Sequence, residues 1–327
     1  MEEKNEKETD NKPKKKHFNI FDWFYRDEKD GNLDKPDDLR VLEKPGIKNF
    51  FKLLGRKLGK LMSANLIMIF GNFPIIFLLL ATSGILSKST IAPLYQSYVP
   101  LNAIYLFDQS PANASLLSIY GIQISVNVIN MTTKVFFVLG LLIIFTWGFT
   151  KVGTTYIYRN IINGDAVFPF SDFAFVAKRN VKQSLVFGIL DAVLVVVFSY
   201  NLYFLFSNAA AGTMNLVMLF LTAVMSIVYF FMRPYMFIMV FMFDLKFGQI
   251  VKNSLYFVIL GIKRNFAALG GVFLLVALNY AIFIIFAPIG IILPFVITLS
   301  IADFIGVYCA YPNILKYMIK EDEKIGT

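Results

Sequence analysis

The residues from which disulfides and many metal sites are built are nearly missing from this chain. Its 327 residues include one cysteine, Cys309, and one histidine, His17. A single cysteine excludes an internal disulfide, and one cysteine with one histidine cannot form the thiolate and imidazole clusters typical of zinc and iron sites. We therefore expect no metal site of that kind and no cofactor.

Charged residues are also scarce. They make up 16% of the chain, against about 25% in an average soluble protein, whereas hydrophobic residues make up 57%. The apolar residues gather into runs, and a helix of about 20 residues is long enough to cross the ~30 Å hydrocarbon core of a bilayer. The composition therefore predicts an all-α integral membrane protein.

The sequence motifs of common enzymes are missing as well. There is no nucleophile elbow, phosphate-binding loop, H-E-x-x-H zinc motif or paired-carboxylate motif, so we expect a non-enzymatic protein. The net charge of +9 does not indicate a nucleic-acid partner. The lysines and arginines flank the apolar runs, where such residues orient membrane helices.

Six apolar runs predict six transmembrane helices within a membrane domain of residues 61–320. The predicted spans are 61–86, 135–158, 184–206, 212–240, 266–286 and 289–311. Lysine and arginine concentrate before the first span, in the connections 159–183 and 241–265, and after the last span. By the positive-inside rule, we expect both termini in the cytoplasm and residues 87–134 in an extracytoplasmic loop.

Two segments precede the first span. Residues 1–45 carry many charges of both signs, which predicts a disordered cytoplasmic tail. Within it, the aromatic stretch FNIFDWF at 18–24 is either a short docked helix or an untethered patch. Residues 46–60, GIKNFFKLLGRKLGK, repeat apolar residues at helical spacing with basic residues between them. This pattern predicts an amphipathic helix that lies in the headgroup plane of an anionic leaflet.

One stretch of nine residues occurs twice with small changes. KQSLVFGIL occupies 182–190, KNSLYFVIL occupies 252–260, and the tripeptide KRN occurs at 178–180 and 263–265. KRN precedes the first copy but follows the second. This order favours a shared local requirement, a basic amphipathic segment that turns into a membrane helix, over the alternative of an internal duplication. The second copy is too short to span and is expected to lie along the cytoplasmic face or to dip shallowly into the membrane before the fifth span.

Basic residues beside the spans are expected to contact lipid headgroups, which makes the anionic bilayer surface one predicted partner. They belong to the helix 46–60 and to the two repeated regions: Lys48, Lys52, Arg56, Lys57, Lys60, Lys178, Arg179, Lys182, Lys252, Lys263 and Arg264.

Four charged residues fall inside the predicted spans: Lys151, Asp191, Arg233 and Asp303. At ~1.5 Å per helical residue, all four lie in the cytoplasmic half of the bilayer. Charges inside a membrane are costly and are candidates for function by default. Two interpretations stay open. The four residues form a polar site reached from the cytoplasm, or they are structural, with the aspartates paired and the basic side chains extended towards headgroups.

The segment FTKVGTTYIYRNIINGDAVFPFSDFAFVAKRNVKQSLVFG, residues 149–188, resembles the signature region of the YesL-like family, bacterial membrane proteins of unknown function. In that pattern a span ends in a basic residue, and a polar-Gly turn, a Pro and an aromatic amphipathic segment lead to the next span. The matching residues are Arg159, Asn163, Gly164, Pro169, Asp172, Phe173 and Gly188. FFMRPYMFIMVFMFDLKFGQIVKNSL resembles a second landmark through Pro234 and Lys252–Leu255.

This resemblance, over roughly residues 46–320, implies a multi-pass protein of a bacterial cell membrane, the plasma membrane of a Gram-positive organism, and no known reaction. It also implies a link to carbohydrate uptake or utilisation. We therefore expect an accessory or regulatory component whose partner is a sugar-uptake transporter or another membrane protein. The alternative is a small-solute transporter that uses the buried charges. GNFP at 71–74 and APIGIILP at 287–294 are candidates for the helix breaks that transporters often contain.

Overall fold

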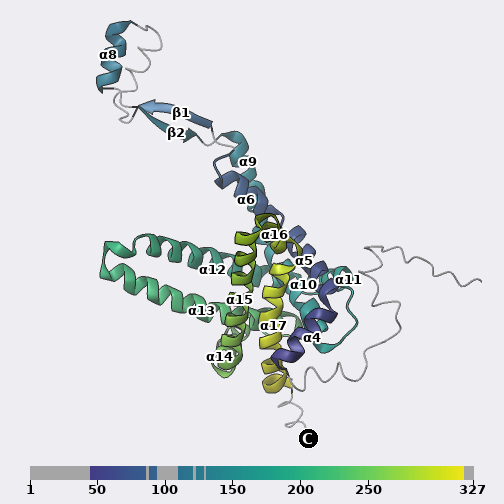
Figure 1. The fold of residues 1–327 in the computed structure, drawn as a ribbon. Helices are drawn as coiled ribbons and strands as arrows, with labels where there is room; N and C mark the ends of the chain where they lie inside the picture. Colours follow the sequence, from purple (N-terminus) through teal and green to yellow (C-terminus); the bar gives the residue numbers. More distant parts are fainter. Residues whose placement is uncertain (1–44, 86–87, 94–109, 121–122, 129, 320–327) are drawn as a thin grey trace, which may run out of the picture.

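The fold is taken from a computed structural model, which describes residues 45–85, 88–93, 110–120, 123–128 and 130–319. The predicted disordered tail and its aromatic stretch lie outside the described residues, apart from Pro45. The described part is a helical domain from which one long projection extends (Figure 1).

Five helical segments among the described residues are long and apolar enough to cross a membrane. They are Met131–Asn163 (α9 Met131–Gly140 with α10 Ile143–Asn163), α12 Val181–Ser207, α13 Thr213–Met242, α15 Ile262–Ile285, and Ala287–Ile319 (α16 Ala287–Leu293, α17 Leu299–Ile314 and a π turn after each). A sixth span results if the bent pair α5 Leu58–Gly71 and α6 Pro74–Thr82 is counted as one. The predicted all-α multi-span fold is confirmed.

The first predicted span, 61–86, is broken where its polar residue and proline lie. α5 and α6 meet at a bend of 55°. The side-chain amide of Asn72 donates to the carbonyl of Met68 over 2.9 Å at the end of α5, and Pro74 starts α6, a position where its missing N–H costs nothing. The break falls in GNFP, as predicted. At the second candidate stretch, α16 passes into a π turn at Pro294.

The predicted interfacial helix is shorter than residues 46–60. α4 comprises Ile47–Arg56, and α5 begins two residues later. The ring of Phe50 packs on the rings of Phe304 and Tyr308 in α17, with centroids 5.7 and 5.3 Å apart. Phe50 thus fixes α4 to α17, while Ile47 and Phe51 stay exposed.

Residues of the predicted outer loop 87–134 build most of the projection. α6 packs along α9, and beyond them β1 Lys88–Pro93 pairs with β2 Gln123–Val128 as an antiparallel ribbon. α8 Pro111–Tyr120 lies at the far end (Figure 1). We call α6, α9, β1, β2 and α8 together the arm.

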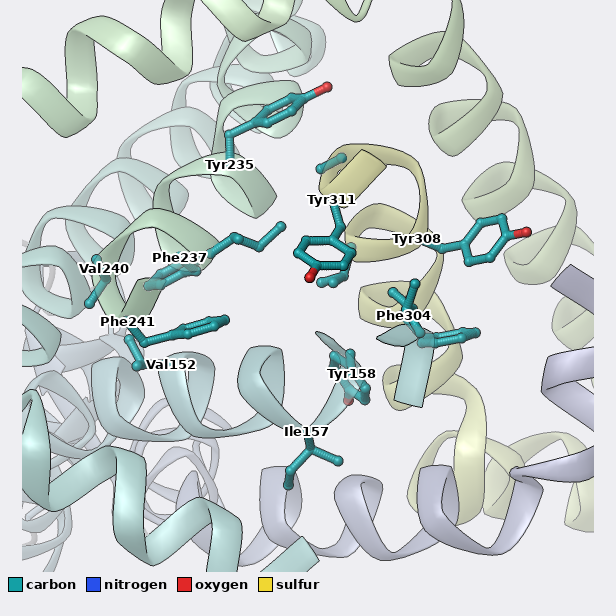
Figure 2. Close-up of a cluster of buried hydrophobic side chains, with 14 of the residues drawn as sticks. Val152, Ile157, Tyr158, Tyr235, Phe237, Val240, Phe241, Phe304, Tyr308 and Tyr311 are labelled. Carbon is teal, nitrogen blue, oxygen red and sulfur yellow. The ribbon is translucent and has the colours of Figure 1, made fainter. Parts of the chain in front are cut away.

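The core lies chiefly between α10, α13 and α17. Figure 2 shows side chains from all three helices, among them Tyr158, Phe241 and Tyr311, gathered in the space between them. α12 and α13 form a long hairpin whose outer part leaves the core and projects sideways (Figure 1). That part exposes large apolar side chains such as Phe206 and Phe220, as a surface in contact with lipid does.

The two copies of the repeated stretch lie in different kinds of element. The first, 182–190, belongs to the long helix α12, which follows the short helix α11 Pro169–Arg179. The second, 252–260, belongs to α14 Phe247–Leu260, a short helix that precedes α15. Equivalent halves of a duplicated unit would place the copies in equivalent elements.

Both KRN tripeptides mark a junction between a short helix and a long one. The side-chain amide of Asn180 donates to the carbonyl of Val176 near the end of α11, over 3.2 Å. The amide of Asn265 donates to the carbonyl of Val258 near the end of α14, over 3.0 Å. Each asparagine donates to a carbonyl in the last turn of the short helix, and this common placement supports a shared local requirement for the motif.

Candidate functional site

The four charged residues inside the spans form two ion pairs. Arg233 of α13 pairs with Asp191 of α12, and Lys151 of α10 pairs with Asp303 of α17 (Nζ to Oδ2, 2.6 Å). The pairing considered from the sequence is therefore confirmed. The two pairs differ sharply in their surroundings.

Asp191 is held by four hydrogen bonds from three residues. The Arg233 guanidinium donates from Nε to Oδ1 and from Nη2 to Oδ2, over 2.6 and 2.7 Å. The hydroxyl of Tyr229 donates to Oδ1 over 2.6 Å, and the indole of Trp147 donates to Oδ2 over 2.7 Å. A carboxylate offers about four acceptor positions, and all of them are used. Asp191 ties α10, α12 and α13 together and has no acceptor position left for a ligand.

Asp303 is bound far less completely. Its Oδ2 accepts one hydrogen bond, from Lys151, and its Oδ1 accepts none from the described residues. The Asp303 side chain is 28% exposed, against 1% for Asp191. The Lys151–Asp303 pair thus keeps unused hydrogen-bonding capacity on both partners, because an ammonium group has three donors.

A small cavity adjoins this second pair, between α10, α13, α15 and α17. Lys151, Arg233 and Asp303 line it, together with the polar side chains of Thr155 and Asn265. The space open to the centre of a water molecule is about 50 Å³, and one water needs roughly 10–15 Å³ of such space. The cavity therefore has room for a few waters or a small ion, well short of the roughly 300–1,000 Å³ of ordinary ligand pockets.

Pro234 removes one backbone donor beside the cavity. It lies inside α13, and because proline has no N–H, the carbonyl of Phe230 loses the donor it would have one turn later. Both residues line the cavity. Backbone groups left unpaired at membrane depth are tolerated where they border such a space.

Helical spacing and a glycine contact bring these residues together. Trp147 precedes Lys151 by four positions on α10, so the two side chains project from the same face of the helix. Where α10 crosses α12, Gly148 meets Gly188, and a Cβ on either one would collide with the backbone of the other helix. Small residues allow this close approach, and it places the Trp147 indole within reach of Asp191.

Trp147 also connects the two pairs. While its indole N–H donates to Asp191, the ammonium of Lys151 lies 5.4 Å from the centroid of its ring. That distance is within the range of a cation–π contact. Trp147 therefore contacts one member of each pair, Asp191 of the first and Lys151 of the second.

Sequence reasoning missed Trp147, Tyr229, Gly148 and the role of Gly188 at this site. A signal was present for the first two. Each is an aromatic hydrogen-bond donor four residues before an intramembrane cation, in W-x-x-x-K and Y-x-x-x-R. No comparable signal identifies the glycine pair, because any small residue in a span can serve in a close helix contact.

Most of the basic residues predicted to contact headgroups are exposed: Lys48, Lys52, Arg56, Lys178, Arg179, Lys182, Lys252 and Lys263. Lys57 and Arg264 are half-buried. Lys60 is buried, because it lies in the first turn of α5 rather than on the interfacial helix.

No group of three or more potential metal ligands (His, Cys, Asp or Glu) occurs in the part of the chain that the structure describes. Comparisons with models of protein families, with curated proteins and with solved structures find no match to this chain.

Proposed function

We propose that this chain is a non-enzymatic accessory or regulatory protein that acts on another membrane protein in carbohydrate uptake or utilisation. As the sequence resemblance implies, we place it in the YesL-like family and in the plasma membrane of a Gram-positive bacterium. Both termini then lie in the cytoplasm, and the outer part of the arm (β1, β2 and α8) lies outside.

The arm is the observation that carries this proposal. It extends well beyond the helical domain and ends in α8 (Figure 1). The antiparallel ribbon β1–β2 is joined to the domain through α6 and α9. A projection of this kind offers a surface to a partner outside the membrane, whereas the passage of a solute between helices does not require it.

The cavity beside Lys151 and Asp303 supports the same choice. A space for a few waters is too small for a sugar, which favours a role in sugar uptake through a partner rather than by direct transport.

Transport of a proton or small inorganic ion is the second candidate. It is favoured by Oδ1 of Asp303, which accepts no hydrogen bond from the described residues and lies beside a cavity that Lys151 also lines. Intramembrane acids of this type serve as relay groups in transporters.

Two variants separate these candidates in cells that lack the native gene. In the first, residues 83–129 are replaced by a short Gly-Ser linker, which removes β1, α8 and β2 but leaves α6 and α9. The second is Asp303→Asn. Both are compared with wild type for uptake of radiolabelled sugars, after equal membrane levels have been checked.

An accessory role predicts that the arm replacement lowers sugar uptake as far as the gene deletion does, while Asp303→Asn keeps most of it. Purified wild-type protein in liposomes should not accumulate labelled sugar by itself. Loss of uptake in Asp303→Asn with an unaffected arm replacement would contradict the accessory role and favour transport. A proton flux into liposomes that Asp303→Asn abolishes would identify the ion.

A further inference from the structure

A second hollow lies away from the ion pairs, where α11 meets α12 beside the end of α13. It is wide and open, with a volume of about 740 Å³. Its wall contains three basic residues, Lys178, Arg179 and Lys182, against one acidic residue, Asp244. None of the three forms a salt bridge within the described residues. The hollow therefore carries an uncompensated positive charge.

The two sides of the hollow are tied to each other. Arg179 donates to the carbonyl of Phe241 over 3.1 Å, and the side-chain amide of Gln183 donates to the carbonyl of Leu245 over 3.3 Å. A guanidinium has five N–H donors, so Arg179 keeps several for a ligand while one anchors it. The first bond holds the Arg179 guanidinium in place before any ligand arrives, which lowers the ordering cost of binding.

An apolar stripe starts at the hollow and follows α12. Lys182 lines the hollow, and Val186, Ile189, Val193 and Val196 continue on the same side of the helix, all of them exposed. From Val186 to Val196 the stripe is ~15 Å long at ~1.5 Å per residue. One leaflet contributes about half of the ~30 Å hydrocarbon core, so the stripe is long enough for an acyl chain.

We propose that this hollow is a binding site for one anionic phospholipid, whose phosphate lies between Lys178, Arg179 and Lys182 and whose acyl chain follows the stripe. Basic pockets between membrane helices are suited to anionic headgroups. A soluble phosphate would satisfy the basic groups but would leave the adjoining stripe without a role. The site does not depend on the proposed accessory function.

The test is native mass spectrometry of the full chain, delipidated in detergent and titrated with phosphatidylglycerol or with zwitterionic phosphatidylcholine. Wild type is expected to bind one phosphatidylglycerol at least about tenfold more tightly than phosphatidylcholine. Removing the three basic groups that attract the anionic headgroup should abolish that preference. The variant is Lys178→Gln/Arg179→Gln/Lys182→Gln.

The matched control, Lys252→Gln/Lys263→Gln/Lys316→Gln, removes the same charge from exposed residues outside the hollow and should keep the preference. If the hollow variant fails to fold, Lys182→Gln alone should lower the preference several-fold. Equal losses in both triple variants, or no preference in wild type, would overturn the site. If millimolar inorganic phosphate displaces phosphatidylglycerol from wild type and from the control but not from the hollow variant, the assignment to a lipid is overturned and the ligand is a soluble anion.

Discussion

Asp191→Asn and Asp303→Asn each remove one negative charge from the domain, but their effects on stability are expected to differ. Asp191 is almost fully buried and neutralises Arg233, whereas Asp303 is partly exposed beside a cavity that can admit water. Breaking a buried ion pair costs on the order of 3–5 kcal/mol, because the remaining charge is left without a partner. Near water the cost is smaller.

For a domain of this size, 1 kcal/mol corresponds to about 2–4 °C in Tm. Asp191→Asn should therefore lower Tm by on the order of 10 °C, and Asp303→Asn by a few degrees. The assay is thermal unfolding of the detergent-purified protein, followed by intrinsic fluorescence.

Second substitutions provide the control. Arg233→Met added to Asp191→Asn removes the stranded charge and should recover part of the loss, since an uncharged pair of similar size is often tolerated. Lys151→Met added to Asp303→Asn should change little. Equal losses for the two aspartates, or a larger loss for Asp303→Asn, would refute the distinction between a structural pair and an open pair.

Three further outcomes are expected. Gly188→Ala should lower Tm or abolish folding, because its Cβ would meet the backbone of Gly148; the control Gly270→Ala, which has open space, should leave Tm within a few degrees. Burial raises the pKa of the Asp172 carboxyl, so ionisation of this carboxyl opposes folding. Asp172→Asn should therefore raise Tm at pH 7. The gain in Tm should vanish as the pH falls below that pKa, because the wild-type carboxyl is then protonated as well. A peptide of residues 46–60 should bind anionic vesicles at low salt and lose affinity as salt is added; a lack of binding at low salt would contradict an interfacial α4.

The membrane spans could be predicted because their length and apolar composition are properties of the local sequence. The break near Asn72 and Pro74 was visible for the same reason. The ion pairs could be predicted in kind, since a lone charge in a membrane is costly, but the choice of partners could not. That choice depends on which helices touch, and the Gly148–Gly188 contact sets part of it.

The outer part of the arm, with β1, α8 and β2, was predicted only as a loop. Its ribbon forms between β1 and β2, which are separated by about 30 residues of chain, and pairing at that distance has no strong signal in a single sequence. The hollow beside α12 was also beyond prediction. Its basic residues could be assigned to the membrane surface. That they lie across the hollow from the end of α13 is a tertiary feature, which the local sequence does not indicate.

In this account β1, β2 and α8 lie on one side of the membrane, and the basic connections lie on the other. Single cysteines at Ala112 in α8, Ala166 after α10 and Gly248 in α14 test it directly, on a Cys309→Ala background. A membrane-impermeant maleimide added to intact cells should label the cysteine at 112 alone, and all three should react after the cells are opened. Labelling from outside at 166 or 248, or protection at 112, would contradict the account.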